Sequence, residues 1–284
     1  MEITTPKAEW PKKILKWDSG GKVFLSVVFT WQLPQAWSLC VWYKEQGYQV
    51  HVGGPAVGLF PEYLNQVATV NGLVVDALVR HNSQATRFST GCVNACSFCA
   101  VPIVEGDITE CEGSPKPIVC DNNLLACSKR HFDYAIDTLK HVRGVDMNQG
   151  LDCRLITPYH IGRLRELDLH CIRFAWDNVK QEYQVMRAIN LCLTAGIPKS
   201  KIRIYVLIGY HDTPEDALYR LQTLKNMGLH KNSPMRFQEI KGDKALVKDS
   251  YLEPSWTEYE MKRFIHYWFR QAWVSNIPYA DWRG

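Results

Sequence analysis

Between residues 85 and 240 the sequence alternates short apolar runs with longer amphipathic stretches, and this alternation restricts the possible folds strongly. Strands that alternate with helices predict a parallel α/β sheet with right-handed crossover connections. Six such units are too few to close an eight-unit barrel, so the pattern predicts an open, partial (β/α)6 barrel. The predicted strands are residues 85–90, 117–120, 145–151, 171–176, 202–208 and 234–240.

Prolines and glycines mark the ends of the helices between these strands. Pro158 and Pro214 stand where the first turn of a helix accepts proline, and Gly196 and Gly228 fall just beyond helix ends. A last amphipathic helix has the i, i+3, i+4 spacing of a packed face, so we expect it to join the core. The predicted helices are residues 132–142, 158–167, 181–195, 213–227 and 256–273.

The first 84 residues have a smaller α/β pattern of their own. A β-branched run at residues 22–30, a helix that begins at Pro34 and ends at Gly47, and a strand at residues 48–52 predict a Rossmann-like β-α-β unit. Residues 67–79 are apolar without a clear pattern. We therefore expect three parts, which are a small Rossmann-like domain at 1–84, the partial barrel at 85–240 and a helical extension at 241–284.

Composition excludes several classes of protein. With 46% hydrophobic residues and a net charge of +4 over 284 residues, the chain is too apolar and too weakly charged to be mainly disordered. No stretch approaches the roughly 18 apolar residues of a membrane span. The N-terminal residues mix charges with prolines, unlike a secretory signal, so we expect a cytoplasmic protein. The small positive charge permits nucleic-acid binding without indicating it.

Cysteine spacing is the most specific chemical feature of the sequence. In a reducing compartment, clustered thiols indicate metal binding or catalysis rather than disulfides. Cys92, Cys96 and Cys99 lie within eight residues, on a loop directly after the first predicted barrel strand. The carboxyl ends of parallel strands are where such folds place their chemistry. Three thiolates on a short loop can bind a four-iron cluster and leave one iron open, because thiolate is the usual ligand of iron–sulfur clusters.

This loop, Cys-x-x-x-Cys-x-aromatic-Cys with Phe98 at the aromatic position, resembles the signature of the radical S-adenosylmethionine (SAM) superfamily. The resemblance covers roughly residues 85–240. It implies a 4Fe-4S cluster bound by Cys92, Cys96 and Cys99, whose open iron is chelated by SAM. It also implies reductive cleavage of SAM to a 5′-deoxyadenosyl radical that abstracts hydrogen from a substrate, with electrons from a donor such as flavodoxin or ferredoxin.

A structural zinc site is the alternative for the same three cysteines. Zinc would need a fourth ligand, such as Cys111 or His131. Structural zinc sites are usually built from paired Cys-x-x-Cys segments, and only one such short spacing occurs here. The spacing therefore favours the iron–sulfur interpretation.

The resemblance also suggests where SAM would bind. Asp121, Asn122 and Asn123 follow the second predicted strand, where the family has a Gly-Gly-Glu-like segment that contacts the amino group of SAM. The sequence departs from that pattern, so the assignment depends on position and on a carboxylate for the ammonium. The alternative is that these residues cap the helical turn at residues 124–127.

Gly209, in the segment after the predicted strand 202–208, matches the family's glycine-containing turn beside adenine. A glycine there would allow close approach of the backbone to a ligand. In the same segment, Thr213 is suited to be the N-cap of the next helix, with Asp216 three residues later.

Polar residues alternate along three predicted strands and so share one face of the sheet. We expect Arg173 to bind the SAM carboxylate and Asp177 a ribose hydroxyl. The alternative for Arg173 is an internal ion pair with Asp146 or Asp152, because buried charges require partners. The alternating residues are Asp146 and Asn148, Arg173 and Asp177, and Arg203 and Tyr205, with Asp152 and Arg154 as similar candidates.

The sequence contains weaker signals for two further cofactors. Cys111, Cys120 and Cys127 would be the ligands of a second iron–sulfur cluster, but their spacing matches no such motif and free cysteine is a common core residue. Residues 49–54 resemble the Asp-x-His-x-x-Gly motif of cobalamin-binding radical SAM enzymes. Gln49 replaces the acid, so His51 lacks a carboxylate behind it, and we do not expect bound cobalamin.

The substrate is less constrained than the cofactors. The segments around residues 121–125 and 148–152 resemble compact radical SAM proteins encoded by bacteriophages, which favours modification of a nucleic-acid base or nucleoside. The same radical chemistry on a peptide or small metabolite is one alternative. A non-catalytic, zinc-stabilised protein that binds nucleic acid is the other.

Overall fold

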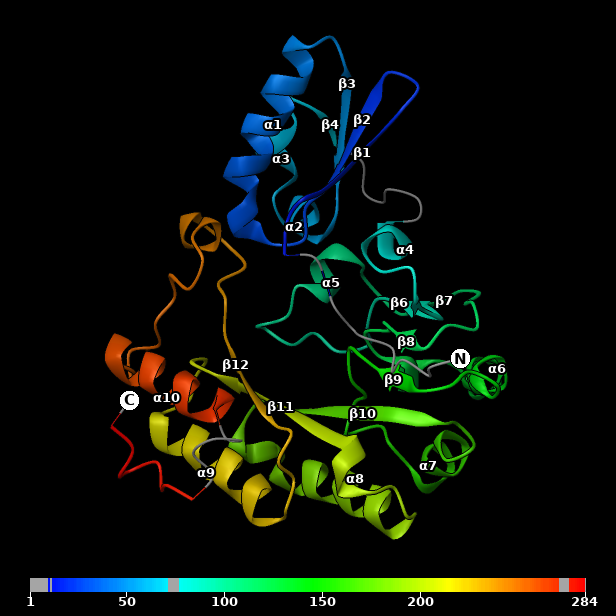
Figure 1. The fold of residues 1–284 in the computed structure, drawn as a ribbon, viewed down its shortest axis with the longest axis vertical. Helices are drawn as coiled ribbons and strands as arrows, with labels where there is room; N and C mark the ends of the chain where they lie inside the picture. The colour runs from blue at the N-terminus through cyan, green and yellow to red at the C-terminus, as the bar shows by residue number, and fades with distance from the viewer. Residues whose placement is uncertain (1–9, 11, 71–76, 271–275, 284) are drawn as a thin grey trace.

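The computed structural model describes residue 10 and residues 12–70, 77–270 and 276–283. A small N-terminal unit stands above a larger α/β unit (Figure 1). Each unit has its own sheet and its own hydrophobic core. None of the helices in these ranges is long and apolar enough to cross a membrane.

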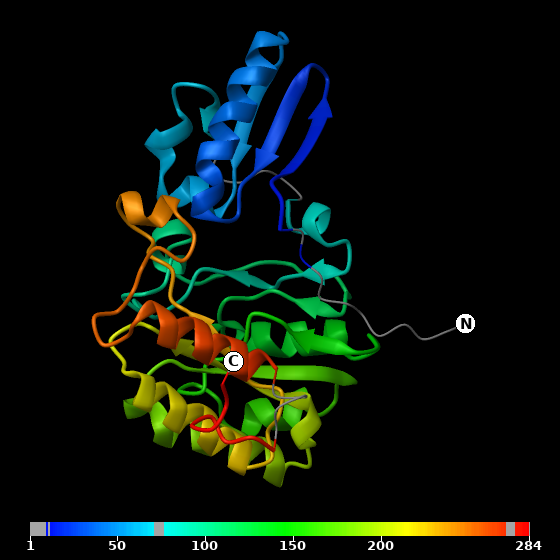
Figure 2. The ribbon, with the colours of Figure 1, turned by 60° about the vertical axis from the view of Figure 1, so that its left-hand side comes forward.

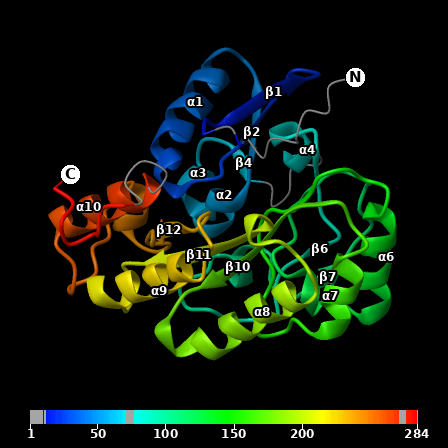
Figure 3. The same cartoon turned by 60° about the horizontal axis from the view of Figure 1, so that its bottom comes forward.

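The larger unit contains a six-stranded sheet in which every neighbouring pair is parallel. The strands follow one another in chain order, so right-handed crossovers place the helices on one face of the sheet. Figure 3 shows α6, α7, α8 and α9 along that outer face. This confirms the predicted parallel α/β sheet. The strands are β5 (Ala85–Thr86), β8 (Ile118–Val119), β9 (Val145–Met147), β10 (Leu169–Trp176), β11 (Ile202–Ile208) and β12 (Ser233–Arg236).

Two helices of this unit begin at the prolines that the sequence marked, Pro158 and Pro214, whereas the helix predicted from residue 132 begins at Lys129. Thr157, Thr213 and Thr257 each accept a hydrogen bond from the backbone N–H three residues later, and Pro158 and Pro214 occupy the first turns. The described part of the predicted helix 256–273 ends at Phe269, and residues 271–273 lie outside the described ranges. The helices are α6 (Lys129–Leu139), α7 (Pro158–Leu164), α8 (Glu182–Thr194), α9 (Pro214–Asn226) and α10 (Glu258–Phe269), with 3₁₀ turns η2 (Leu124–Ala126), η3 (Val179–Gln181) and η4 (Lys199–Lys201).

The two faces of the parallel sheet differ in character. On the helix side, residues such as Met147, Phe174 and Ile204 are buried in the main core. On the opposite face, the alternate positions include Asp146 and Arg173, both of which are buried. The predicted polar face is therefore present.

The N-terminal unit contains the predicted β-α-β arrangement, with β2 and β3 parallel and joined through α1. An additional strand, β1, forms an antiparallel hairpin with β2. This strand was not predicted, because its alternation of apolar and polar residues is short. The elements are β1 (Leu15–Ser19), β2 (Lys22–Ser26), η1 (Thr30–Gln32), α1 (Leu33–Glu45), β3 (Gln49–Gly53), α2 (Pro55–Leu59), α3 (Pro61–Leu64) and β4 (Thr69–Val70).

The unassigned stretch at residues 67–79 contains β4 and the beginning of α4 (Ala77–His81), while residues 71–76 lie outside the described ranges. The predicted strand 85–90 is wrong as a single strand. It is divided into β5 and β6 (Ser89–Thr90), and β6 pairs with β7 (Thr109–Glu110) instead of joining the parallel sheet. The hydrogen bonding between this segment and the parallel sheet ends after β5, because the backbone N–H of Phe88 donates to the carboxylate of Asp121.

The C-terminal segment contacts both units, which the predicted boundary at residue 241 did not anticipate. Met261, Phe264 and Trp268 of the predicted apolar stripe of α10 lie in the core of the parallel sheet, whereas Phe269, also predicted to face the core, is 61% exposed. Before it, η5 (Asp243–Leu246) reaches the N-terminal unit, where the hydroxyl of Thr30 donates to the carbonyl of Ala245 at 2.5 Å. Figure 2 shows this orange turn beside the helices of the N-terminal unit. The domain boundaries themselves stay predictions.

Candidate functional site

The cysteine loop, residues 91–100, lies at the carboxyl ends of the parallel strands. It is followed by the short helix α5 (Val101–Val104). Residues that follow β8, β9 and β11 contact the loop directly through Asn123, Asp152 and Tyr210. Asp177, which follows β10, interacts electrostatically with Cys99. Segments far apart in sequence therefore meet at the edge where parallel α/β folds bind ligands.

Amide groups surround the sulfur of Cys92. The backbone N–H and the side-chain Nδ2 of Asn94 both lie 3.5 Å from Cys92 Sγ. Asn123 Nδ2 lies 3.4 Å from the same sulfur. Donors of this kind stabilise a thiolate, which is the form that binds iron.

Arg154 interacts with both a carboxylate, that of Asp152, and a second thiol of the loop, that of Cys96. Its guanidinium binds Asp152 through two hydrogen bonds of 2.8 and 2.9 Å. Those hydrogen bonds, and an interaction with Cys96, raise the pKa of Arg154. Burial opposes ionisation of Asp152, but the hydrogen bonds from Arg154 outweigh it and lower the pKa of the carboxyl group. The pair is therefore ionised near neutral pH.

The three thiols of the loop lie close enough to influence one another. Burial raises the pKa of Cys99, and a hydrogen bond from the backbone of Val101 opposes that increase. The negative charges of Cys96, Cys92 and Asp177 raise it further. Binding of a positively charged metal group would remove this mutual repulsion.

The three thiols of the loop are candidate ligands of a metal group. Among the residues that the structure describes, no three His, Cys, Asp or Glu side chains are close enough to hold one metal ion. A single zinc ion, with bonds of about 2.3 Å, requires its ligand sulfurs to converge tightly. A four-iron cluster binds each thiolate at a different iron, so its ligands are spread more widely. The three thiols of the loop are all half-buried.

The loop is also fixed at both ends. Gly91 donates its N–H to Glu105 Oε2 at 2.8 Å, and Asn122 Nδ2 donates to the same oxygen at 2.6 Å. At the other end, the hydroxyl of Tyr210 donates to Ser97 Oγ at 2.8 Å, and the rings of Tyr210 and Phe98 meet edge to face at 5.5 Å. Phe98 therefore anchors the loop to the end of β11.

Asp121, Asn122 and Asn123 have three different environments. The carboxylate of Asp121 is buried and accepts hydrogen bonds from Phe88 N and Ser89 Oγ, so its oxygens are used to shape the start of the loop. Asn122 binds Glu105. Asn123 is 2% exposed, and its Oδ1 finds no hydrogen-bond partner in the described part of the chain. The alternative role as a side-chain cap is not seen at Asn123, whose side chain makes no capping bond to η2.

Arg173 forms the internal ion pair that the sequence left as its alternative. Its Nε donates to Asp146 Oδ1 at 2.9 Å, and its two terminal nitrogens donate to Asp146 and to the hydroxyl of Tyr205. These bonds occupy most of the donors of the guanidinium. The pair is 7% and 2% exposed and stabilises the polar face of the sheet.

Two carboxyl groups near the loop, those of Asp121 and Asp177, have pKa values that burial raises and that no close ion pair offsets. Burial raises the pKa of Asp177 to about 6, and the charges of Arg154 and Arg220 reduce the increase. Asp177 itself is half-buried beside the cysteine loop, and carboxyl groups with raised pKa values in such places are common in functional sites.

Gly209 has a left-handed backbone, with φ of +72°. A Cβ atom at this position would lie 2.8 Å from the terminal methyl of Met261 on α10, a flexible group that can move, so it is the backbone angle that favours glycine here. The side chain of Asp212 accepts the N–H of Gly209 at 2.8 Å and binds the buried Arg220 at 2.5 Å. The predicted capping role of Thr213 is confirmed, with reciprocal bonds to Asp216.

The ligands of the alternative metal sites are used elsewhere or separated. His131 contacts the carbonyl of Phe88 at 2.7 Å and Glu110 at 3.7 Å through its two ring nitrogens. Cys111 and Cys127 interact electrostatically near Ser89. Cys120, in contrast, packs with Ala85 and Ile118 in a separate small core.

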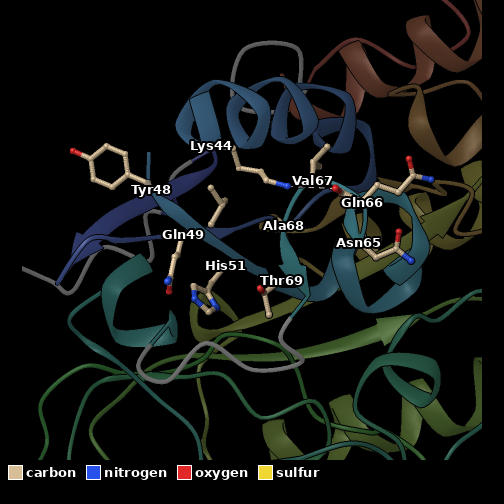
Figure 4. Close-up of a pocket in the computed structure, with 10 residues that line it drawn as sticks. Lys44, Tyr48, Gln49, His51, Asn65, Gln66, Val67, Ala68 and Thr69 are labelled. Atoms are coloured by element: carbon tan, nitrogen blue, oxygen red, sulfur yellow. Dashed lines mark hydrogen bonds between the residues drawn. The ribbon is translucent and has the colours of Figure 1, made fainter. Parts of the chain in front are cut away.

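A pocket of about 420 Å³ lies in the N-terminal unit, away from the cysteine loop (Figure 4). Gln49 and His51 point to one side of β3, and the ring of His51 stacks on Phe24 at 5.2 Å. His51 is thus part of a strand, as expected, and packs against an aromatic ring. The pocket is lined by Lys44, Tyr48, Gln49, Val50, His51, Asn65, Gln66, Val67, Ala68 and Thr69.

Two contributors to the site were missed by the sequence analysis. Asn94 lies inside the motif but was treated as a spacer residue, and only its contacts with Cys92 and Asp152 show its position. Tyr210 was included in a segment near Gly209, yet nothing in the sequence connected it with Ser97, 113 residues away. An amide or a phenol in a loop carries no spacing signal by which it could have been found.

No protein-family model matches the sequence, and no curated protein does. The functional interpretation therefore depends on the residues and the geometry described above.

Proposed function

We propose that the protein is a radical SAM enzyme that binds a 4Fe-4S cluster through Cys92, Cys96 and Cys99. One observation carries the proposal. Three half-buried thiols on one loop, each approached by a hydrogen-bond donor or a cation, lie at the carboxyl edge of a six-stranded parallel sheet. When bound, the cluster would supply the electron that cleaves SAM to a 5′-deoxyadenosyl radical.

The side chains around the loop are suited to hold the polar groups of SAM. The buried, unpartnered Oδ1 of Asn123 offers an acceptor to an ammonium group, which makes Asn123 a better candidate than Asp121. Asp177 would accept a hydrogen bond from a ribose hydroxyl. Phe98 and Tyr210 would keep the loop rigid and exclude water.

The sheet is proposed to be the open, partial barrel of this class. Its strands run in chain order and all in parallel, and its polar face carries the buried pair of Arg173 and Asp146. Arg203, on the same face, has a buried Nε without a partner among the described residues. An anionic group of a ligand would satisfy it.

The proposed substrate is a nucleic-acid base or nucleoside, with a peptide or small metabolite as the alternative. The free donor of Arg203 and the nearby positive charge of Lys231 favour a ligand with a phosphate. Binding of tRNA or DNA that weakens steeply with salt would support the nucleic-acid substrate, and salt-independent binding of a small metabolite would support the alternative.

Iron content tests the assignment of the ligands. After anaerobic reconstitution we expect about four irons per chain, as in a four-iron cluster. Cys96→Ala should lose this iron, because two thiolates cannot hold the cluster. Cys111→Ala and Cys127→Ala are matched controls that should retain it. Zinc without iron, or full iron in Cys96→Ala, would contradict the proposal and would favour the zinc-stabilised alternative or another site.

A further inference from the structure

Asp152 organises the surroundings of Cys92. We propose that Asp152 is a positioning residue that directs the side-chain N–H groups of Asn94 and Asn123 at Cys92 Sγ, and that these hydrogen bonds make the reduction potential of the cluster less negative. The inference rests on the proposed function. It adds a role for a carboxylate that contacts neither the sulfur nor the iron.

The hydrogen bonds to Asp152 determine which end of each amide faces the sulfur. Asp152 Oδ2 accepts from Asn94 Nδ2 at 2.8 Å and from Asn123 Nδ2 at 3.3 Å. An ionised carboxylate can only accept, so it selects the NH2 end of both amides. Each NH2 group has two hydrogens, and the second can point to Cys92 Sγ, 3.5 Å from Asn94 Nδ2 and 3.4 Å from Asn123 Nδ2.

Without the carboxylate, either amide could rotate and present its oxygen to the sulfur. An oxygen would repel a thiolate, whereas an N–H stabilises it. The carboxylate of Asp152 is itself held in place, because Arg154 binds both of its oxygens and its side chain is 6% exposed. The positive charge of Arg154 also offsets the negative charge that Asp152 brings near the cluster.

The sign of the effect follows from the charge that reduction adds. One electron makes the cluster and its thiolates more negative, so hydrogen bonds to sulfur stabilise the reduced form more than the oxidised form. Loss of both side-chain hydrogen bonds should lower the equilibrium constant for one-electron reduction by about tenfold. For a one-electron couple this makes the midpoint potential more negative by about 59 mV.

The test is a redox titration of the reconstituted protein, followed by electron paramagnetic resonance. The Asn94→Leu/Asn123→Leu variant keeps the size of both side chains and removes both donors. We expect its midpoint potential to be more negative than that of the unsubstituted protein, at equal iron content. Asn226→Leu, an exposed site on α9, is the matched control and should leave the potential unchanged. An unchanged potential in the double variant would overturn the inference.

A spectroscopic measurement separates positioning from charge. With asparagine that carries 15N only at the side-chain amide, the reduced cluster of the unsubstituted protein should show 15N coupling by electron–nuclear double resonance, free of any signal from the backbone N–H of Asn94. This coupling should be lost in Asp152→Leu. Absence of coupling in the unsubstituted protein, or its persistence in Asp152→Leu, would refute the role of Asp152. If the unsubstituted protein assembles no cluster, the proposed function fails instead.

Discussion

At the scale of single residues, the site combines an ionised pair with a half-buried carboxyl group, Asp177, that has no close ion-pair partner. Arg154 and Asp152 compensate each other through two hydrogen bonds. Asp177 has no such compensation, and burial is the main reason why its pKa rises to about 6. The cost of ionising Asp177 should therefore be measurable as a dependence of stability on pH.

We expect Asp177→Asn to stabilise the cofactor-free protein above pH 6. The folded protein binds more protons at Asp177 than the unfolded chain between the ordinary pKa of 3.8 and about 6, so its stability falls as pH rises through this range. The asparagine variant does not ionise and so avoids that loss. Above pH 6 its free energy of unfolding should exceed that of the unsubstituted protein by about 1–3 kcal/mol at most. Urea unfolding at several pH values measures the difference. A difference that does not grow between pH 4 and pH 7 would contradict the environment described for Asp177.

At the scale of structural elements, the cysteine loop depends on one close backbone contact. Gly91 has φ of +73°, and a Cβ atom there would lie 2.1 Å from the carbonyl oxygen of Asp107. Gly106 has nearly the same φ, +72°, but a Cβ atom there would meet nothing within 4 Å. The two glycines thus share the backbone strain and differ in the steric contact.

We predict that Gly91→Ala displaces the loop and Gly106→Ala does not. Both should lose about 1 kcal/mol because alanine disfavours a left-handed backbone. Gly91→Ala should lose more stability than Gly106→Ala, because its loop must move away from Asp107. For the same reason, it should bind little iron after reconstitution. Urea unfolding and iron analysis of the two variants provide the comparison. Equal stability and equal iron in both would show that the contact does not fix the loop.

Most elements of the larger unit could be predicted from the sequence, because the helices have amphipathic periodicity and clear end signals. The strand 202–208 and the first residues of α7 and α9 are examples. The break at Phe88 could not be predicted, since it depends on Asp121, 33 residues away. For the same reason, the sequence could place Arg173 and Asp146 on one face but could not decide that they pair.

At the scale of the whole molecule, two hydrophobic cores support two sheets. The N-terminal core contains residues such as Leu25 and Val52, and the main core contains Phe174 and Ile204. The units are also linked by Thr30 and Ala245. Separate cores allow one unit to open while the other stays folded.

We expect Leu25→Ala to lower the free energy of opening of β2 and β3 by about 2–5 kcal/mol, the usual cost of such a cavity. Strands β10 and β11 should keep their protection, because they lie in the other core. Hydrogen exchange followed by mass spectrometry compares the two sets of peptides. Equal loss of protection in both units would show that the molecule opens as one cooperative body.

The central claim is that the cysteine loop supports reductive cleavage of SAM. The most direct measurement is the amount of 5′-deoxyadenosine formed by the anaerobically reconstituted protein with dithionite and SAM. We predict formation of 5′-deoxyadenosine together with methionine, and no product from Cys96→Ala. Protein that contains about four irons per chain but forms no 5′-deoxyadenosine, with or without candidate substrates, would contradict the account.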